Sequence, residues 1–315
     1  MEYLKDKEEI NDTKKILFTG LDTAGKSSII LALKREFSKI AIINPTKGAQ
    51  RRIFEFLGLN ISEWDLGGQS LYRISYLKNP DKYFDNTEVA IYIIDIQNQG
   101  RAQESISYLK DVLKEFKALK IDPPVHIFFH KFDPALNVKA RNKMKDYISD
   151  IKSQLKEELS YDKLYYHKTS IYNIASLIEA ISKILIGLFP RSQLLKDTIE
   201  EFARKLNCEG LLIVDRNTFI IGSFFKNSKI KTLMVNSIPY FMTLSDILLD
   251  SKIVEINEED QILVEKVNEH IIFRRLLMRE SSPQYYLLLL KKGQYFYKEG
   301  DFEALINLIS NIIYE

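Results

Sequence analysis

The chain has 315 residues, a length typical of two domains that each bury a core. Its 45 lysine and arginine residues against 43 aspartate and glutamate residues leave a net charge of +2, which gives no electrostatic basis for binding nucleic acid. The single cysteine, Cys208, fits a reducing compartment, and the longest apolar runs are far shorter than a membrane span. We therefore expect a cytoplasmic protein with no transmembrane segment, for which any membrane recruitment would act through partners.

Residues 14–190 alternate short apolar runs of β-forming residues with longer segments of mixed charge, the pattern of a parallel sheet covered by helices. Strands are expected at residues 15–19, 52–56, 60–64, 89–95, 126–130 and 165–168. Helices are expected at residues 27–37, 101–120, 138–159 and 174–188. The pattern predicts an α/β domain over residues 1–190 with a mixed, mostly parallel sheet.

Beyond Pro190, which ends the last of these helices, the pattern changes. An amphipathic helix is expected at residues 191–206, and later helices at 237–249 and 302–313. Between them lie expected strands at residues 210–214, 218–225, 261–268, 270–278 and 284–290, the first two joined by a turn at 215–217. Residues 191–315 therefore predict a second domain of the α+β class.

Residues 20–27, GLDTAGKS, match the phosphate-binding pattern GxxxxGK[ST] directly after an expected strand and at the start of an expected helix. The glycines allow backbone N–H groups to surround phosphate oxygens, Lys26 reaches the terminal phosphates, and Ser27 can ligate Mg²⁺. A carboxylate at Asp22 would repel the terminal phosphate unless it turns away. The expected phosphate contacts are Gly20, Asp22, Thr23, Ala24, Gly25, Lys26, Ser27 and Ser28.

Residues 64–69, WDLGGQ, end the next strand that is expected inside the sheet. Asp65 can hold Mg²⁺ through water, and Gly68 can offer its N–H group to a γ-phosphate. Gln69 then falls beside the attacking water, where an amide can accept from the water and donate to the transferring group. Without the phosphate loop, a strand-end cap and an ordinary loop residue would be the simpler interpretation of Asp65 and Gln69.

Residues 130–133, HKFD, follow another expected strand. The Asp133 carboxylate can accept two hydrogen bonds from N1 and N2 of guanine, which adenine cannot supply. Lys131 would lie across the base, and backbone groups of Ser170 and Ile171 would complete the pocket. An ordinary solvated loop is the competing interpretation of this run taken alone.

The order of these motifs resembles the Ras-like small GTPases throughout residues 14–190. The phosphate loop and the Pro45-Thr46 pair look like the Arf group. The HKFD run, the residues 169–172 and the α+β tail look like the Rag/Gtr group, whose members carry a C-terminal longin/roadblock-type dimerisation domain. The tail favours the Rag/Gtr group.

The resemblance implies a GTP/GDP switch with slow, Mg²⁺-dependent hydrolysis, in which Gln69, Lys26 and Thr46 are catalytic and His130 belongs to the base site. It implies that Thr46 completes a metal site with Ser27 and Asp65. It also implies a homo- or heterodimer, GTPase-activating and exchange proteins, and room for a roadblock-type platform as partners. Two alternatives are a nucleotide-stabilised dimerisation scaffold with little turnover and an Arf-like membrane-trafficking GTPase. His130 stands where most small GTPases have asparagine, which leaves ATP or XTP open as ligands, and no arginine finger is identifiable.

Overall fold

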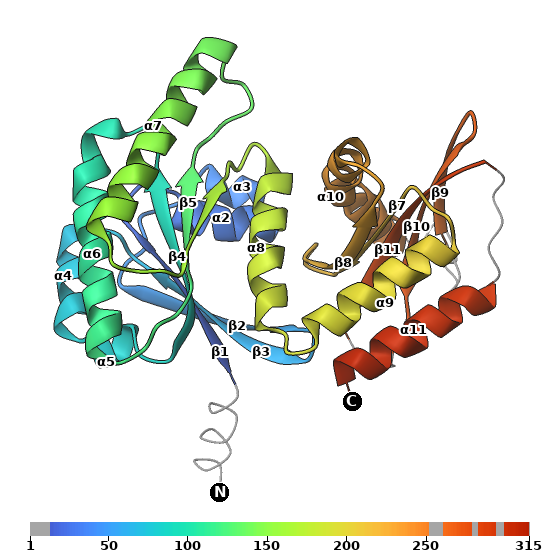
Figure 1. Ribbon diagram of the computed structural model, residues 1–315, viewed down its shortest axis with the longest axis horizontal. Helices are drawn as coiled ribbons and strands as arrows, with labels where there is room; N and C mark the ends of the chain where they lie inside the picture. The colour runs from blue at the N-terminus through green and yellow to red at the C-terminus, as the bar shows by residue number, and fades with distance from the viewer. Residues whose placement is uncertain (1–12, 252–260, 279–282, 294–298, 315) are drawn as a thin grey trace, which may run out of the picture. The chain divides into compact units, whose positions relative to one another are not determined.

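The computed structural model describes residues 13–251, 261–278, 283–293 and 299–314 (Figure 1). The chain divides into two compact units. The first comprises Met1–Glu55 with Leu59–Ala180, and the second comprises Phe56–Gly58 with Ile181–Glu315.

The first unit is built on a six-stranded sheet with the order β2-β3-β1-β4-β5-β6. Parallel pairing joins β1 to β3 and β4, and joins β5 to β4 and β6. A two-residue turn links β2 to β3 through Leu57 and Gly58, whose φ angles of 51° and 74° suit a tight antiparallel hairpin. The strands are β1 Lys14–Gly20, β2 Ala49–Phe56, β3 Leu59–Leu66, β4 Thr87–Asp95, β5 Val125–His130 and β6 Leu164–Lys168. The expected mixed, mostly parallel sheet is confirmed.

Helices follow most of these strands. They are α2 Lys26–Leu33, α3 Phe37–Ile40, α4 Ser70–Lys78, α5 Pro80–Tyr83, α6 Ala102–Ala118, α7 Val138–Glu158 and α8 Ile174–Leu188, with a short 3₁₀ turn η1 at Gln99–Arg101. The helix expected over residues 27–37 is too long, because the chain leaves it after Leu33 and Arg35 takes a left-handed φ of 59°. The expected elements did not include α4, which has no continuous buried stripe: its Leu71 and Ile74 are exposed.

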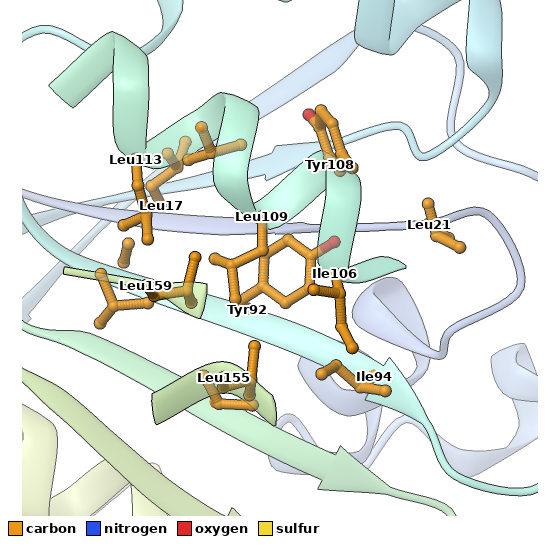
Figure 2. Packing of buried hydrophobic residues seen from close by; sticks show 14 of the residues in the cluster. Leu17, Leu21, Tyr92, Ile94, Ile106, Tyr108, Leu109, Leu113, Leu155 and Leu159 are labelled. Carbon is orange, nitrogen blue, oxygen red and sulfur yellow. The ribbon is translucent and has the colours of Figure 1, made fainter. Parts of the chain in front are cut away.

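The core of this unit lies on the two faces of the sheet. Figure 2 shows Leu17 of β1 and Tyr92 of β4 packed near Leu109 of α6 and Leu155 of α7. The neighbouring Ile91 points to the opposite face, because side chains alternate along a strand, and it is also fully buried. Burial on both faces explains why β4 reads as one apolar run instead of an alternating one.

The second unit contains a five-stranded antiparallel sheet with the order β8-β7-β11-β10-β9. Its strands are β7 Gly210–Asp215, β8 Ile220–Phe225, β9 Gln261–Lys266, β10 Glu269–Leu276 and β11 Tyr285–Lys292. The expected α+β architecture is confirmed. Its β7 and β11 lie inside the sheet and are almost completely buried, whereas β9 forms an exposed edge.

Three helices accompany this sheet: α9 Ser192–Lys205, α10 Ser228–Ser251 and α11 Glu299–Tyr314. On one face α9 packs so closely over Gly222 that a Cβ there would lie 2.0 Å from Ile199. On the other face α10 covers Gly210, where a Cβ would lie 2.3 Å from the sulfur of Met234. The sequence predicted only residues 237–249 of α10, and the structure corrects its start to Ser228. Among the helices that the structure describes, none is long and apolar enough to span a membrane.

Candidate nucleotide and metal site

The candidate residues meet at one edge of the first unit's sheet. The parallel strands β1, β3, β4, β5 and β6 all end at that edge, and the phosphate loop, residues 65–69, residues 95–97, the HKFD run and residues 169–171 follow them directly. In open α/β sheets, the carboxyl ends of parallel strands are the usual place for ligands. The fold therefore brings together motifs that lie far apart in the sequence.

The phosphate loop needs both of its glycines. Gly20 has a φ of 137°, and a Cβ on it would lie 2.5 Å from the carbonyl oxygen of Ile93. Gly25 has a φ of 100°, and a Cβ on it would lie 2.7 Å from the ring of His130. The loop is therefore wedged between β4 and the HKFD run, and a side chain at either glycine would displace it.

Lys26 is held inside this loop. Its Nζ donates hydrogen bonds to the carbonyl oxygens of Gly20 and Leu21, at 3.1 and 2.7 Å, and the side chain is buried. Burial lowers the pKa of Lys26 to about 8, while the carboxylates of Asp65 and Asp22 act in the opposite direction. A phosphate would favour the charged form of this ammonium group further, so Lys26 is prepared to bind an anion.

The remaining residues of the loop differ in exposure. Ala24 is buried beneath the loop, Thr23 is exposed with a φ of 57°, and Ser28 is half-buried in the first turn of α2. The carboxylate of Asp22 turns toward Arg101, with 2.7 Å between Oδ1 and Nη2. This is the orientation that the sequence required if Asp22 were not to repel a bound phosphate.

Three oxygen-bearing side chains from three different segments form a cluster beside Lys26. The Ser27 and Thr46 hydroxyl oxygens are 2.6 Å apart, and Ser27 donates to Oδ2 of Asp65 at 2.5 Å. Thr46 also donates to that oxygen, at 3.4 Å. Two hydroxyls and a carboxylate are hard oxygen ligands, the kind that Mg²⁺ prefers.

The surroundings of Asp65 fit a cation at this cluster. Its Oδ1 is buried and has no hydrogen-bond partner among the residues that the structure describes. Burial raises the pKa of Asp65, although the Ser27 hydrogen bond and the Lys26 charge oppose the shift. A buried carboxylate with one unpartnered oxygen is costly in a bare protein, and a bound cation removes that cost.

Two glycines lock the end of β3 against its neighbours. Gly67 donates its N–H to Gly48 at 2.9 Å, and a Cβ on Gly67 would lie 2.4 Å from the carbonyl oxygen of Thr46. The Gly68 carbonyl accepts from Asp22 N–H at 3.0 Å, and a Cβ there would lie 2.2 Å from that nitrogen. Gln69, half-buried, follows directly as the residue before α4.

The carboxylate of Asp133 lies in a polar loop cluster. Ser170 donates to its Oδ1 at 2.5 Å, and the side-chain amide of Gln97 donates to its Oδ2 at 2.8 Å. Lys131 donates to the Thr23 carbonyl at 3.0 Å and forms an ion pair with Asp95. The HKFD run is thus tied to the phosphate loop and to the end of β4.

His130 links two of these loops. Its ring is fully buried, and its Nδ1 lies 3.0 Å from the hydroxyl oxygen of Thr169. Burial lowers the pKa of His130 to about 4, so the ring is neutral near pH 7. Ile171, half-buried, follows Ser170 in the loop after β6, whose backbone groups the sequence predicts beside the base.

Sequence reasoning missed Asp95, Gln97 and Arg101. Asp95 is the last residue of β4, which lies between β1 and β5, and Gln97 and Arg101 follow that strand. A usable signal was present, because Asp95 ends an apolar strand in the same way as Asp65 and residues 130–133 do. Without the strand order, however, the sequence does not show that Asp95 lies beside Lys131.

This arrangement defines the class of protein. A phosphate loop between β1 and α2, a hydroxyl and carboxylate cluster beside its lysine, and a polar loop with a buried histidine form a P-loop nucleotide-binding domain. An antiparallel α+β unit accompanies it in the same chain.

Comparison with known proteins identifies the family. The sequence model described as "Gtr1/RagA G protein conserved region" matches residues 15–248. The chain therefore belongs to the Gtr1/RagA G protein family, which confirms the Rag/Gtr-like assignment made from the motifs.

Individual relatives come from the Arf group. ADP-ribosylation factor-like protein 3 of Chlamydomonas reinhardtii is 39% identical over 119 residues, which are 38% of this chain and 63% of that protein. ADP-ribosylation factor-like protein alp41 of Schizosaccharomyces pombe is 37% identical over 105 residues, 33% of this chain and 53% of that protein. The matches thus span about half to two thirds of these relatives.

Among solved structures, the Arl6 BBS3 small GTPase of Trypanosoma brucei, with the bound nucleotide analogue GppNp, aligns at a TM-score of 0.43 and 20% identity. The alignment covers 55% of this chain and 95% of that one.

Proposed function

We propose that the protein is a GTP/GDP switch that hydrolyses GTP slowly with Mg²⁺ and signals through protein partners. The observation that carries this proposal is the convergence of Ser27, Thr46 and Asp65, from three separate segments, within hydrogen-bond distance beside Lys26. Membership of a G protein family supports the same function. A scaffold that merely holds nucleotide has no need for this combination together with Gln69.

Ser27, Thr46 and Asp65 are the residues that would hold Mg²⁺. When bound, the ion neutralises charge on the terminal phosphates. Lys26 and the N–H groups of the phosphate loop would bind the same phosphates, and the N–H of Gly68 would donate to the γ-phosphate. Gln69 orients water for in-line attack and does not itself need to remove the proton.

Nucleotide discrimination is proposed to depend on Asp133, with Lys131, His130, Ser170 and Ile171 shaping the base pocket. A carboxylate accepts hydrogen bonds and donates none, so it matches the N1 and N2 donors of guanine and not the acceptor N1 of adenine. Competition among GTP, ATP and XTP for the site tests this choice. Preferred binding of ATP or XTP would contradict it.

Single-turnover hydrolysis of bound GTP tests the catalytic assignment. Gln69→Leu is expected to slow phosphate release at least about 100-fold, the order of effect when one oriented polar group is lost from a transition state, with little change in GTP affinity. Gln103→Leu is the matched control, because Gln103 is exposed on α6 and its side-chain amide pairs with the amide of Gln154. Equal rates for Gln69→Leu and the parent would contradict the assignment.

We also propose that residues 191–315 form a longin/roadblock-like dimerisation domain, as homo- or heterodimer. Two surfaces of the second unit support this: the edge strand β9 exposes Leu263 and Val264, and α10 exposes Tyr240 and Ile247. A strand at the edge of a sheet and an exposed apolar helix face are typical means of association. GTPase-activating and exchange proteins, and a roadblock-type platform, are the further partners of this proposal.

A further inference from the structure

A chain of alternating charges runs from the phosphate loop to the helix α4. Arg101 contacts Asp22 through Nη2 at 2.7 Å and donates from Nε to Glu104 at 2.8 Å. Glu104 in turn accepts from Nη2 of Arg73 at 2.5 Å, and Arg73 belongs to α4. The four side chains come from three segments and lie in the order acid, base, acid, base.

The position of Asp22 makes this chain relevant to the nucleotide. Its N–H donates to the carbonyl of Gly68, whose own N–H is proposed above to meet the γ-phosphate. On that proposal, Asp22 lies at the terminal-phosphate end of the loop. The charges of Asp22, Arg73 and Arg101 all act on the pKa of Lys26. These charged groups therefore lie close enough to Lys26, the residue proposed to bind phosphate, to act on it electrostatically.

Both arginines of this charge chain have additional contacts. Arg101 sits at the end of η1, directly before α6, and also donates to the backbone carbonyl of Asp22 at 3.4 Å. The Arg73 side chain is 12% exposed, and its guanidinium lies 5.1 Å from the ring of Tyr108. The Asp22, Arg101 and Glu104 side chains are each about a third or more exposed, so solvent screens their pairs and each one has a modest effect.

We propose that Arg101 is a positioning residue that neutralises Asp22 beside the phosphate site and thereby sets the preference for nucleoside triphosphate over diphosphate. Glu104 and Arg73 extend this control to α4. A triphosphate carries more negative charge than a diphosphate, and the additional charge lies at the end nearest Asp22. Exposing the Asp22 carboxylate therefore weakens triphosphate binding more than diphosphate binding.

This inference rests on the proposed function, and its test begins with the parent protein. Dissociation constants for GDP and for a non-hydrolysable GTP analogue, each with Mg²⁺, give a triphosphate-to-diphosphate ratio. A parent that binds neither nucleotide contradicts the proposed function itself. A parent that binds both allows the inference to be judged separately from the variants.

Arg101→Ala is expected to raise the ratio of the dissociation constant for the GTP analogue to that for GDP about fivefold. This is the order of effect for one partly exposed charge close to another. The double variant Asp22→Asn with Arg101→Ala is expected to return the ratio close to that of the parent. Glu104→Gln is expected to shift the ratio in the opposite direction, because it removes the negative charge that pairs with the guanidinium groups of Arg73 and Arg101. Lys114→Ala is the control, since it removes a cation from α6, the helix that carries Glu104, in an exposed pair with Asp111.

A purely structural role gives a different result. If Arg101 only supports packing, Arg101→Ala weakens both nucleotides equally and the double variant shows no recovery. Either outcome would overturn the inference, as would a Glu104→Gln ratio that moves with Arg101→Ala. Thermal melts of each variant establish that the compared proteins are folded.

Discussion

Replacing Asp65 by asparagine separates metal binding from folding. Asp65 is 4% exposed, burial raises its pKa, and its Oδ1 has no hydrogen-bond partner among the described residues. Removing the charge relieves the free-energy cost of a buried carboxylate. It also weakens the hydrogen bonds that Ser27 and Thr46 donate, because these bonds no longer end on a charged oxygen. Since a charged hydrogen bond contributes about 1 kcal/mol more than a neutral one and burying an ion costs several, we expect the metal-free variant to be as stable as the parent or about 1 kcal/mol more stable.

The variant should instead lose its response to metal. A ligand at about 100 times its dissociation constant stabilises the folded state by about 2.7 kcal/mol. For a domain of this size, that corresponds to about 5 to 10 °C in the melting temperature. Thermal melts with GDP, in excess Mg²⁺ and in excess chelator, should therefore show this gain in the parent and none in Asp65→Asn, so the order of stability reverses when metal is added.

Glu63→Gln is the matched control. Glu63 lies two residues earlier on β3, is buried, has its pKa raised by burial, and pairs with Arg52 at 2.6 Å. Its replacement should lower stability, because Arg52 loses a charged partner, and should leave the gain from Mg²⁺ unchanged. A full Mg²⁺ response in Asp65→Asn, or loss of the response in Glu63→Gln, would refute the assignment of Asp65 as a metal ligand.

Two further predictions concern pH and assembly. Burial lowers the pKa of His130 to about 4, whereas an unfolded chain has a histidine pKa of about 6.5, so the unfolded state takes up the proton first and stability falls below about pH 6.5. Urea unfolding should show that His130 lowers the free energy of unfolding by about 2 kcal/mol between pH 7 and pH 5. The loss should be smaller in His130→Asn, and identical pH dependence in the parent and the variant would contradict the calculation. Tyr240, 77% exposed on α10, is expected at an interface, so Tyr240→Asp should reduce a light-scattering mass of twice 36.8 kDa toward the single-chain value. A parent mass of one chain at all concentrations and in both nucleotide states would contradict self-association.

Much of the fold was predictable because its signals are local. Each strand of the first sheet is a short apolar run, and the phosphate loop is contiguous in sequence, so strand order was not needed to recognise either. The expected start of α10 at residue 237 puts Pro239 in the first turn, where proline is tolerated, yet the helix begins at Ser228, where Asn227 accepts from the N–H of Ile230. Pro239 has no N–H to donate to the carbonyl of Val235, so one backbone hydrogen bond of the helix is missing there, and α10 nevertheless continues through it.

The pairings within the site were not predictable in this way. Asp22 and Arg101 are 79 positions apart, and Gln97 and Asp133 are 36 apart. Their contact depends on β4 lying between β1 and β5, which no local pattern specifies. The sequence therefore predicts that the Asp22 carboxylate must turn away from phosphate, but it does not predict that Arg101 is the side chain with which it pairs.

The two glycines after β3 explain how a change at the phosphate could reach other segments. Gly67 has no room for a Cβ because of Thr46 and Gly48, and Gly68 has none because of Asp22. Packing this close cannot absorb a shift gradually, since atoms already at contact distance must move together or separate. Movement of residues 67–68 toward or away from a γ-phosphate would therefore displace the segment around Thr46 on one side and the phosphate loop on the other. Because Arg101 ties that loop to Glu104 and onward to α4, the charge chain lies on the same route as the glycine contacts.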